Sequence, residues 1–214
     1  MTEPIAVIGS GCRLPGSVTT PSELWSLLKD PRDILTRIPA SRFHSQGFYH
    51  SNGQHHGHSN VIHSYFLSTD DSSHRCFDAK FFNVRPAEAV VMDPQIRLLL
   101  EVVYEALDSG GLPLEDLRGS DTAVYVGFMM SDYERLMLRD EDTIGQYHVT
   151  GTTRSLASNR ISYFFDWHGP SITVNTACSS SLVAVHHAIK QLRSGQSRVA
   201  IAAGANLILD PHQS

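Results

Sequence analysis

Residues 171–182 have the sequence Ser-Ile-Thr-Val-Asn-Thr-Ala-Cys-Ser-Ser-Ser-Leu, and this stretch decides the fold. The β-branched run at 171–174 predicts a buried strand, and residues 179–192 predict a helix. Cys178 therefore lies at a strand-to-helix turn, where the partial positive charge and free N–H groups of the helix end favour thiolate over thiol. A thiolate at such a turn is suited to act as a covalent nucleophile in acyl transfer.

Position alone leaves other interpretations of this turn open. A lone cysteine in an apolar setting is often a small buried hydrophobic residue. The serines at 179–181 suggest a serine hydrolase, but the chain contains no Gly-x-Ser-x-Gly elbow, so we expect them to form local hydrogen bonds. His186 and His187 follow roughly 12 Å further along the helix axis, which favours packing over a role as the base in direct contact with Cys178.

Alternating strands and helices along the chain predict a layered α/β fold. Strands are expected at 5–8, 122–128, 171–174 and 199–209, and helices at 21–29, 93–110, 132–139, 156–165 and 179–192. Residues 44–76 are rich in Ser, His, Asn and Gly and predict a long surface excursion. The helix that Asp93 caps is the clearest, since Pro94 occupies its first turn and Gly110-Gly111 ends it.

Helical spacing of apolar residues predicts which helix faces are buried. The helix after Asp93 has such a face at Ile96, Leu99, Leu100, Val103 and Leu107. For the helix after Cys178 the predicted inward stripe is Leu182, Val185, Ile189 and Leu192, with the small residues Ala184 and Ala188 on the other side. We expect this helix to be crowded all round, as in a sandwiched layer.

Residues 176–182, Thr-Ala-Cys-Ser-Ser-Ser-Leu, resemble the active-site motif of β-ketoacyl synthases, specifically the ketosynthase domain of iterative type I polyketide synthases. The resemblance covers essentially the whole chain through ordered motifs at 3–16, 20–25, 77–84, 92–101, 104–107 and 158–163. Residues 150–155 and 167–170 are most similar to fungal reducing synthases, some of which are fused to a peptide synthetase. The resemblance implies a thiolase-like, layered α-β-α-β-α fold, of which residues 1–214 would be the N-terminal half.

The resemblance also implies a function. Cys178 would be the catalytic residue that accepts an acyl group from a carrier-protein phosphopantetheine thioester, with its own backbone N–H as one oxyanion donor. A malonyl thioester would then be decarboxylated and would attack the acyl-cysteine. The implied partners are an acyl carrier protein domain, acyl and malonyl thioesters and a second copy in a homodimer. No cofactor or metal would be bound directly by this chain.

The sequence departs from the family pattern in two ways. The decarboxylation histidines of related enzymes lie in a His-Gly-Thr-Gly-Thr motif and an Asn-Ile-Gly-His motif, and neither occurs before the chain stops at Ser214. We therefore expect a truncated ketosynthase domain that does not condense substrates alone. Asn175 stands where the family usually has Asp, a change from which we infer no loss of activity. The alternatives are a non-catalytic binding or dimerisation module and a fatty-acid condensing enzyme of the same fold.

Three other segments invite a functional interpretation. Gly9-Ser10-Gly11 suggests a dinucleotide loop, but Leu14 replaces the third glycine and Pro15 would break the helix, so a tight turn after the first strand is favoured. The histidines between His50 and His63 match no zinc spacing, which favours a solvated loop. Residues 128–130, Phe-Met-Met, either line an acyl tunnel or pack in the core.

Charge and composition limit the partners and the compartment. The net charge of −5 gives no basic surface for nucleic acid or an anionic membrane. No apolar stretch reaches the length of a membrane span, and no secretory signal follows Met1. Cys12, Cys76 and Cys178 are odd in number and far apart, so we expect neither a zinc site nor a disulfide framework, but a reducing, cytoplasmic setting.

Overall fold

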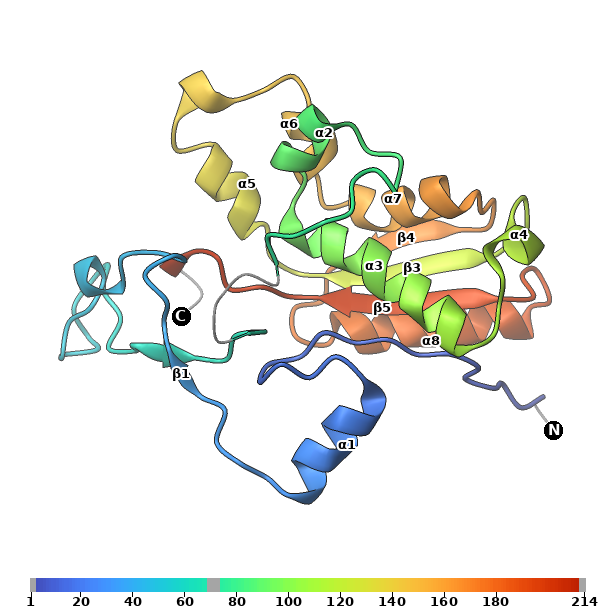
Figure 1. Ribbon diagram of the computed structural model, residues 1–214, viewed down its shortest axis with the longest axis horizontal. Helices are drawn as coiled ribbons and strands as arrows, with labels where there is room; N and C mark the ends of the chain where they lie inside the picture. The colour runs from blue at the N-terminus through green and yellow to red at the C-terminus, as the bar shows by residue number, and fades with distance from the viewer. Residues whose placement is uncertain (1–2, 69–73, 212–214) are drawn as a thin grey trace. The chain divides into compact units, whose positions relative to one another are not determined.

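The computed structural model describes residues 3–68 and 74–211. The chain forms two compact units, one made of residues 1–11 and 77–206 and the other of residues 12–76 and 207–214 (Figure 1). The first unit contains the stretch at 171–182 and most of the regular structure.

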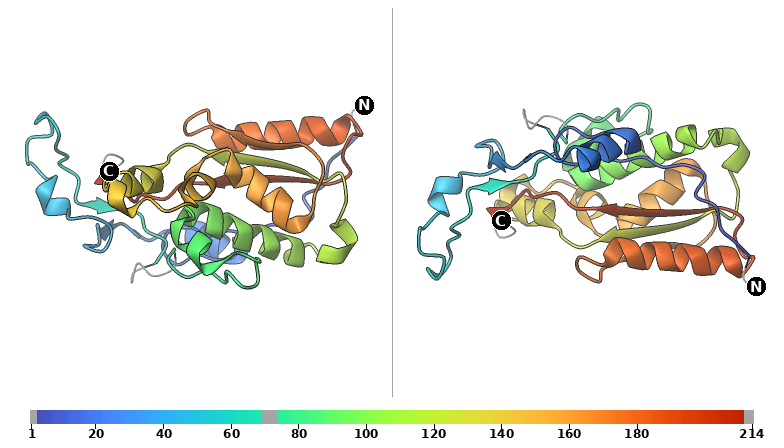
Figure 2. Two further views of the ribbon diagram at one scale, coloured as in Figure 1. Left: turned by 90° about the horizontal axis from the view of Figure 1, so that it is seen from above. Right: turned by 90° about the horizontal axis from the view of Figure 1, so that it is seen from below.

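The first unit is built on a three-stranded parallel sheet of order β4-β3-β5. Its strands are β3 (Ala123–Phe128), β4 (Ser171–Val174) and β5 (Ala200–Ala205). The helices α3 (Pro94–Ser109) and α7 (Leu156–Phe165) cover one face of the sheet, and α8 (Ser180–Arg193) covers the other (Figure 2). This α/β/α arrangement confirms the predicted layered α/β class.

Alternation along β3 divides the core into two parts. Val124, Val126 and Phe128 are fully buried in the larger cluster with α3 and α7. Ala123 and Tyr125 face the other way and pack in a smaller cluster with α8. Because side chains of a strand point alternately to the two faces of a sheet, a strand covered on both faces is apolar at every position.

The helix α3 begins and ends where the sequence predicts. The Asp93 side chain accepts a hydrogen bond from the Gln95 N–H, Pro94 is the first helical residue and Gly110 is the C-cap. The predicted apolar face is buried, with no residue more than 4 % exposed: Ile96, Leu99, Leu100, Val103 and Leu107.

Shorter helices complete the first unit. They are α2 (Pro86–Val91), α4 (Leu114–Leu117), α5 (Asp132–Met137) and α6 (His148–Thr152), with a 3₁₀ turn at Glu141–Thr143. The helices predicted at 132–139 and 156–165 and the strand predicted at 122–128 are confirmed, the helix at 132–139 ending two residues early.

The strand predicted at Ile5–Ile8 is wrong. The segment has no strand pairing among the described residues, and Val7 is 90 % exposed. The chain runs along α3 instead, since a Cβ on Gly9 would lie 2.1 Å from the Ala106 carbonyl oxygen and Ser109 Oγ accepts a hydrogen bond from Ser10 N–H. Close backbone approach to a helix, rather than a turn after a strand, explains the glycine here.

Two burial predictions around Cys178 are also wrong. The strand β4 is at the sheet edge, so Ile172 is 45 % exposed rather than buried. In α8, Ala184 and Ala188 are the residues that pack on β3, whereas Leu182 is 73 % exposed. Because Ala184 and Ala188 are small, α8 lies close to the sheet. Leu182, on another side of the helix, points away from the sheet. The strand predicted at 199–209 ends early, at Ala205.

The second unit has less regular structure. Its helix α1 (Pro21–Lys29) has the predicted Thr20 cap, reinforced by Glu23 in a capping box. A two-stranded antiparallel ladder joins β1 (Thr36–Arg37) and β2 (His63–Ser64), and a 3₁₀ turn lies at Ser45–Gly47. Its small core consists of Ile38, Phe43 and Phe66. Part of the surface excursion predicted at 44–76, residues 69–73, lies outside the described residues.

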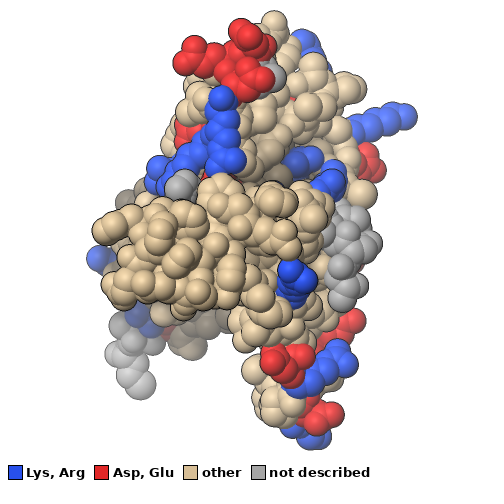
Figure 3. Space-filling view, turned by 90° about the vertical axis from the view of Figure 1, so that its left-hand side faces the viewer, with Lys and Arg blue, Asp and Glu red and all other residues tan. Residues whose placement is uncertain are grey.

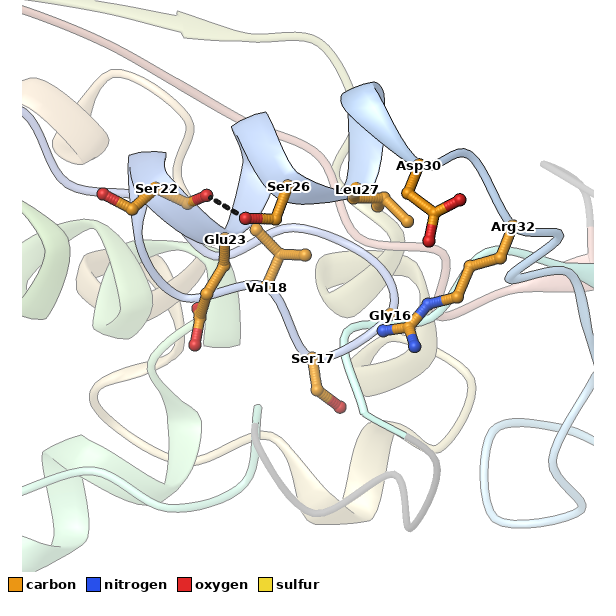
Figure 4. Close-up of a pocket in the computed structure, with 9 residues that line it drawn as sticks. All are labelled: Gly16, Ser17, Val18, Ser22, Glu23, Ser26, Leu27, Asp30 and Arg32. Atoms are coloured by element: carbon orange, nitrogen blue, oxygen red, sulfur yellow. Dashed lines mark hydrogen bonds between the residues drawn. The ribbon is translucent and has the colours of Figure 1, made fainter.

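A hollow of about 500 Å³ lies in the second unit, between α1 and the segment Gly16–Val18 (Figure 4). The Ser26 hydroxyl that lines it donates a hydrogen bond to the Ser22 carbonyl 3.0 Å away, within the helix. The charged residues that line the hollow are Glu23, Asp30 and Arg32. Cys178 is not among the residues that line this hollow.

Acidic and basic side chains both occur, in small groups, on the face of the molecule drawn in Figure 3. Within residues 3–68 and 74–211 no helix combines the length and the apolar character that a bilayer crossing requires.

Candidate active site

Cys178 lies in the turn between β4 and α8, as predicted, at the carboxyl end of the parallel sheet. The last residue of β4, Val174, pairs with Gly127 of β3. The helix begins two residues after the cysteine, at Ser180. Cys178 is exposed and its sulfur is free, so it is not the small buried hydrophobic residue that position alone allowed.

A dense set of hydrogen bonds holds the turn. Ser179 Oγ donates to the Thr176 carbonyl at 2.7 Å, and Ser180 Oγ donates to the Ala177 carbonyl at 2.6 Å. Ser180 Oγ also accepts from the Thr176 N–H at 2.9 Å. The local hydrogen bonds predicted for the serines at 179–181 are confirmed for Ser179 and Ser180. The Asn175 side chain accepts from the Ala177 N–H at 3.1 Å, and Ala177 itself has a left-handed φ of 57°.

Two glycines bring the sheet directly under the first turn of α8. A Cβ on Gly127 would lie 2.5 Å from the Ser181 nitrogen and 2.6 Å from the Ser180 carbonyl carbon. A Cβ on Gly204, the neighbour of Gly127 in β5, would lie 2.8 Å from the Ser181 Cβ. The small residues at 202–205, Ala-Ala-Gly-Ala, predict close packing in that strand, whereas Gly127 was missed. An isolated glycine inside an apolar strand is the signal for such an approach.

The two histidines on α8 do not reach Cys178 by any contact that the structure shows. Both are exposed, and their rings contact each other edge to face at 5.8 Å. His187 stacks on Tyr125, with ring centroids 5.7 Å apart. The packing role predicted for His187 fits this contact.

The remaining sequence candidates lie elsewhere. Phe128 is fully buried in the larger core cluster, so it packs in the core rather than lining an open tunnel. In the loop of the second unit, His55 and His58 meet at 3.0 Å between their Nδ1 atoms and His50 stacks on His55. Among the described residues, no group of three His, Cys, Asp or Glu side chains is arranged to hold a metal ion.

The Asp93 carboxyl, predicted from the sequence only as the cap of α3, is fully buried. Burial raises the pKa of Asp93 to about 6, against the opposing effects of its hydrogen bonds from Gln95 and the charge of Arg97. Asp132, at the start of α5, is also fully buried and adds a small further rise. The Asp93 carboxyl therefore changes charge near neutral pH.

The sheet, its helical layers and the turn define a layered α/β domain with an exposed cysteine at a strand-to-helix turn. Residues 2–214 match the model of the β-ketoacyl synthase N-terminal domain, so the chain belongs to this family. The predicted family is confirmed.

The chain is similar to fungal polyketide synthases. It is 63 % identical over 209 residues to a hybrid PKS-NRPS synthetase of Penicillium oxalicum, covering 98 % of this chain and 5 % of that protein. It is 61 % identical over 209 residues to a reducing polyketide synthase of Botryotinia fuckeliana, covering 98 % of this chain and 8 % of that protein. The chain thus spans less than a tenth of the length of these curated relatives.

A solved structure supports the thiolase-like fold class. The oxazolomycin ketosynthase domain of Streptomyces albus superposes with a TM-score of 0.85 at 31 % sequence identity. The match covers 97 % of this chain and 35 % of the chain in the solved structure. The predicted fold class is confirmed.

Proposed function

We propose that Cys178 is the acyl-accepting nucleophile of a polyketide ketosynthase domain. The observation that carries this proposal is the exposed, free thiol at a hydrogen-bonded turn, in a chain of the β-ketoacyl synthase family. The similarity to reducing polyketide synthases favours this class over a fatty-acid condensing enzyme.

In the proposed step the Cys178 thiolate attacks the carbonyl carbon of an acyl thioester. A new C–S bond forms through a tetrahedral oxyanion, which the backbone N–H of Cys178 would stabilise. The C–S bond to the carrier then breaks, and the carrier sulfur leaves with the electron pair as a thiolate, which takes up a proton to become a thiol. The carrier would be the phosphopantetheine arm of an acyl carrier protein.

The second half of the proposed reaction is a decarboxylative Claisen condensation. Loss of CO₂ from a malonyl thioester leaves a carbanion that attacks the acyl-cysteine and releases the Cys178 thiolate. The two histidine motifs that serve this half in related enzymes do not occur in the 214 residues. We therefore assign acyl transfer to this chain and condensation to a complete domain, which would act as a homodimer in the reducing cytoplasm.

The test is intact-mass spectrometry after incubation with a short acyl thioester. The wild-type protein and Cys76→Ala should gain one acyl group, and Cys178→Ala should gain none. Cys76 is a matched control because it is also exposed and free, in the other unit. Equal labelling of all three proteins, or none in the wild type, would refute the assignment.

A further inference from the structure

Asn175 connects the turn that carries Cys178 to the end of β3. Its Oδ1 accepts a hydrogen bond from the Ala177 N–H at 3.1 Å, and its Nδ2 donates to the Met129 carbonyl at 3.3 Å. Met129 directly follows β3, the central strand of the sheet. One side chain thus joins the turn before α8 to the neighbouring strand end.

An amide makes both contacts at once, which a carboxylate cannot do. One neighbour of the Asn175 side chain is an N–H donor and the other is a carbonyl acceptor, so the orientation of the amide is fixed by its partners. Asp at this position could accept from Ala177 but would turn a second acceptor toward the Met129 oxygen. The Met129 oxygen also accepts from Arg154 Nη1 at 3.3 Å, so it anchors two donors.

The bond to Ala177 lies where the backbone needs support. Ala177 has a φ of 57°, a left-handed conformation that is strained for a residue other than glycine. Its peptide precedes Cys178 directly, so relaxation of this residue would re-aim both the thiol and the Cys178 N–H. The hydroxyls of Ser179 and Ser180 bond two carbonyl groups and one N–H of the turn, whereas the Ala177 N–H is bonded by Asn175.

We infer that Asn175 is a positioning residue for acyl transfer at Cys178, acting through both arms of its amide. The oxygen arm holds Ala177 in its left-handed conformation, and the nitrogen arm fixes the turn to Met129. This inference rests on the proposed function, because it concerns the alignment of the same nucleophile.

The test compares two reactions of Cys178 in Asn175→Ala. Acylation by a short acyl thioester needs an aligned thiol and oxyanion donor, whereas alkylation by iodoacetamide needs only an accessible, reactive thiol. We expect the acylation rate at saturating thioester to fall about tenfold, which is the effect on a barrier of losing one typical hydrogen bond. The thioester concentration that gives half of this rate should not change. Alkylation of Cys178 relative to Cys76 in the same molecule should change less than about twofold.

Asn175→Asp separates the two arms. It keeps an acceptor for the Ala177 N–H but loses the bond to Met129. In about 1 M salt the Debye length is about 3 Å, so the charge that the aspartate adds is screened. Under these conditions the acylation rate of Asn175→Asp should lie between those of wild type and Asn175→Ala. A wild-type rate under these conditions would refute the nitrogen arm.

The matched control is Asn52→Ala. Asn52 Oδ1 accepts from the Gln54 N–H at 3.0 Å, the same local geometry as at Asn175, but in a loop of the second unit. It should leave acylation unchanged. A normal acylation rate in Asn175→Ala, or a loss matched by Asn52→Ala, overturns this inference alone. A wild-type protein without acylation at Cys178 overturns the proposed function and this inference together.

Discussion

The sharpest prediction concerns Gly127→Ala, which adds one methyl group beneath the first turn of α8. Alanine is ordinarily favoured over glycine inside a strand, by roughly 0.5–1 kcal/mol. At Gly127 we expect the opposite sign. The new Cβ would lie 2.5 Å from the Ser181 nitrogen, 2.6 Å from the Ser180 carbonyl carbon and 2.9 Å from the Ser180 oxygen. All three are backbone atoms, which cannot swing aside as the end of a long side chain can.

The size of the effect follows from these distances. Ordinary contact begins at 3.4 Å, so the start of α8 must withdraw by about 1 Å from a methyl carbon that would lie at 2.5 Å. Overpacking of this kind costs about 1–3 kcal/mol of unfolding free energy. Because Cys178 lies only two residues before α8, we expect the thiol to move with the start of the helix. A displacement of about 1 Å at a reacting group can lower the rate about a hundredfold.

Two measurements on Gly127→Ala check this reasoning. Urea denaturation gives the loss of unfolding free energy, and time-resolved intact-mass spectrometry gives the rate of Cys178 acylation. Gly145→Ala is the control, since its new Cβ would meet only a Val91 methyl, at 3.9 Å. Unchanged stability and unchanged acylation in Gly127→Ala would show that the sheet does not support the nucleophile as described.

Two further predictions concern the start of α3 and the outer side of α8. Burial raises the pKa of Asp93 from 3.8 to about 6. Between these pH values the carboxyl is protonated in the native protein and ionised in the unfolded chain. The unfolding free energy should therefore fall by about 2–3 kcal/mol as the pH rises from about 4 to 7. Urea titrations should show this fall in wild type and its loss in Asp93→Asn, and an identical fall in both proteins would contradict it. Leu182 is 73 % exposed on α8, so Leu182→Glu should change the unfolding free energy in urea denaturation by less than about 0.5 kcal/mol. A loss as large as that of a buried leucine would show that this side of α8 is covered.

Local signals predicted most of the helices and the position of the turn at Cys178 well. The helix α3 is bounded by an Asp cap, a first-turn proline and a terminal glycine, and each of these acts within a few residues. The turn at Cys178 follows from a β-branched run and a helix start that meet in sequence. Such features depend on near neighbours, and the sequence shows near neighbours directly.

The wrong predictions all depend on distant neighbours. Apolar periodicity shows that α8 has an apolar side, but it does not show that Ala184 and Ala188 are the residues that pack against Ala123 and Tyr125 of β3. The apolar run Ile5–Ile8 has strand composition, yet it lies along α3. The two arms of Asn175 were not predictable either, since Met129 lies far from it in sequence.

The pairing of β3 with β5 has a consequence for protein synthesis. Gly127 and Gly204, which together support the start of α8, come from strands separated by most of the second half of the chain. The ribosome adds residues at about 5–20 per second and releases the N-terminal part first, and parallel pairing between distant strands forms slowly. Cys178 therefore emerges before β5 has been made. Until β5 docks beside β3, the first turn of α8 packs on Gly127 without the support of Gly204. The turn at Cys178 is therefore completed only after β5 has been made and has docked, later than the synthesis of its own residues.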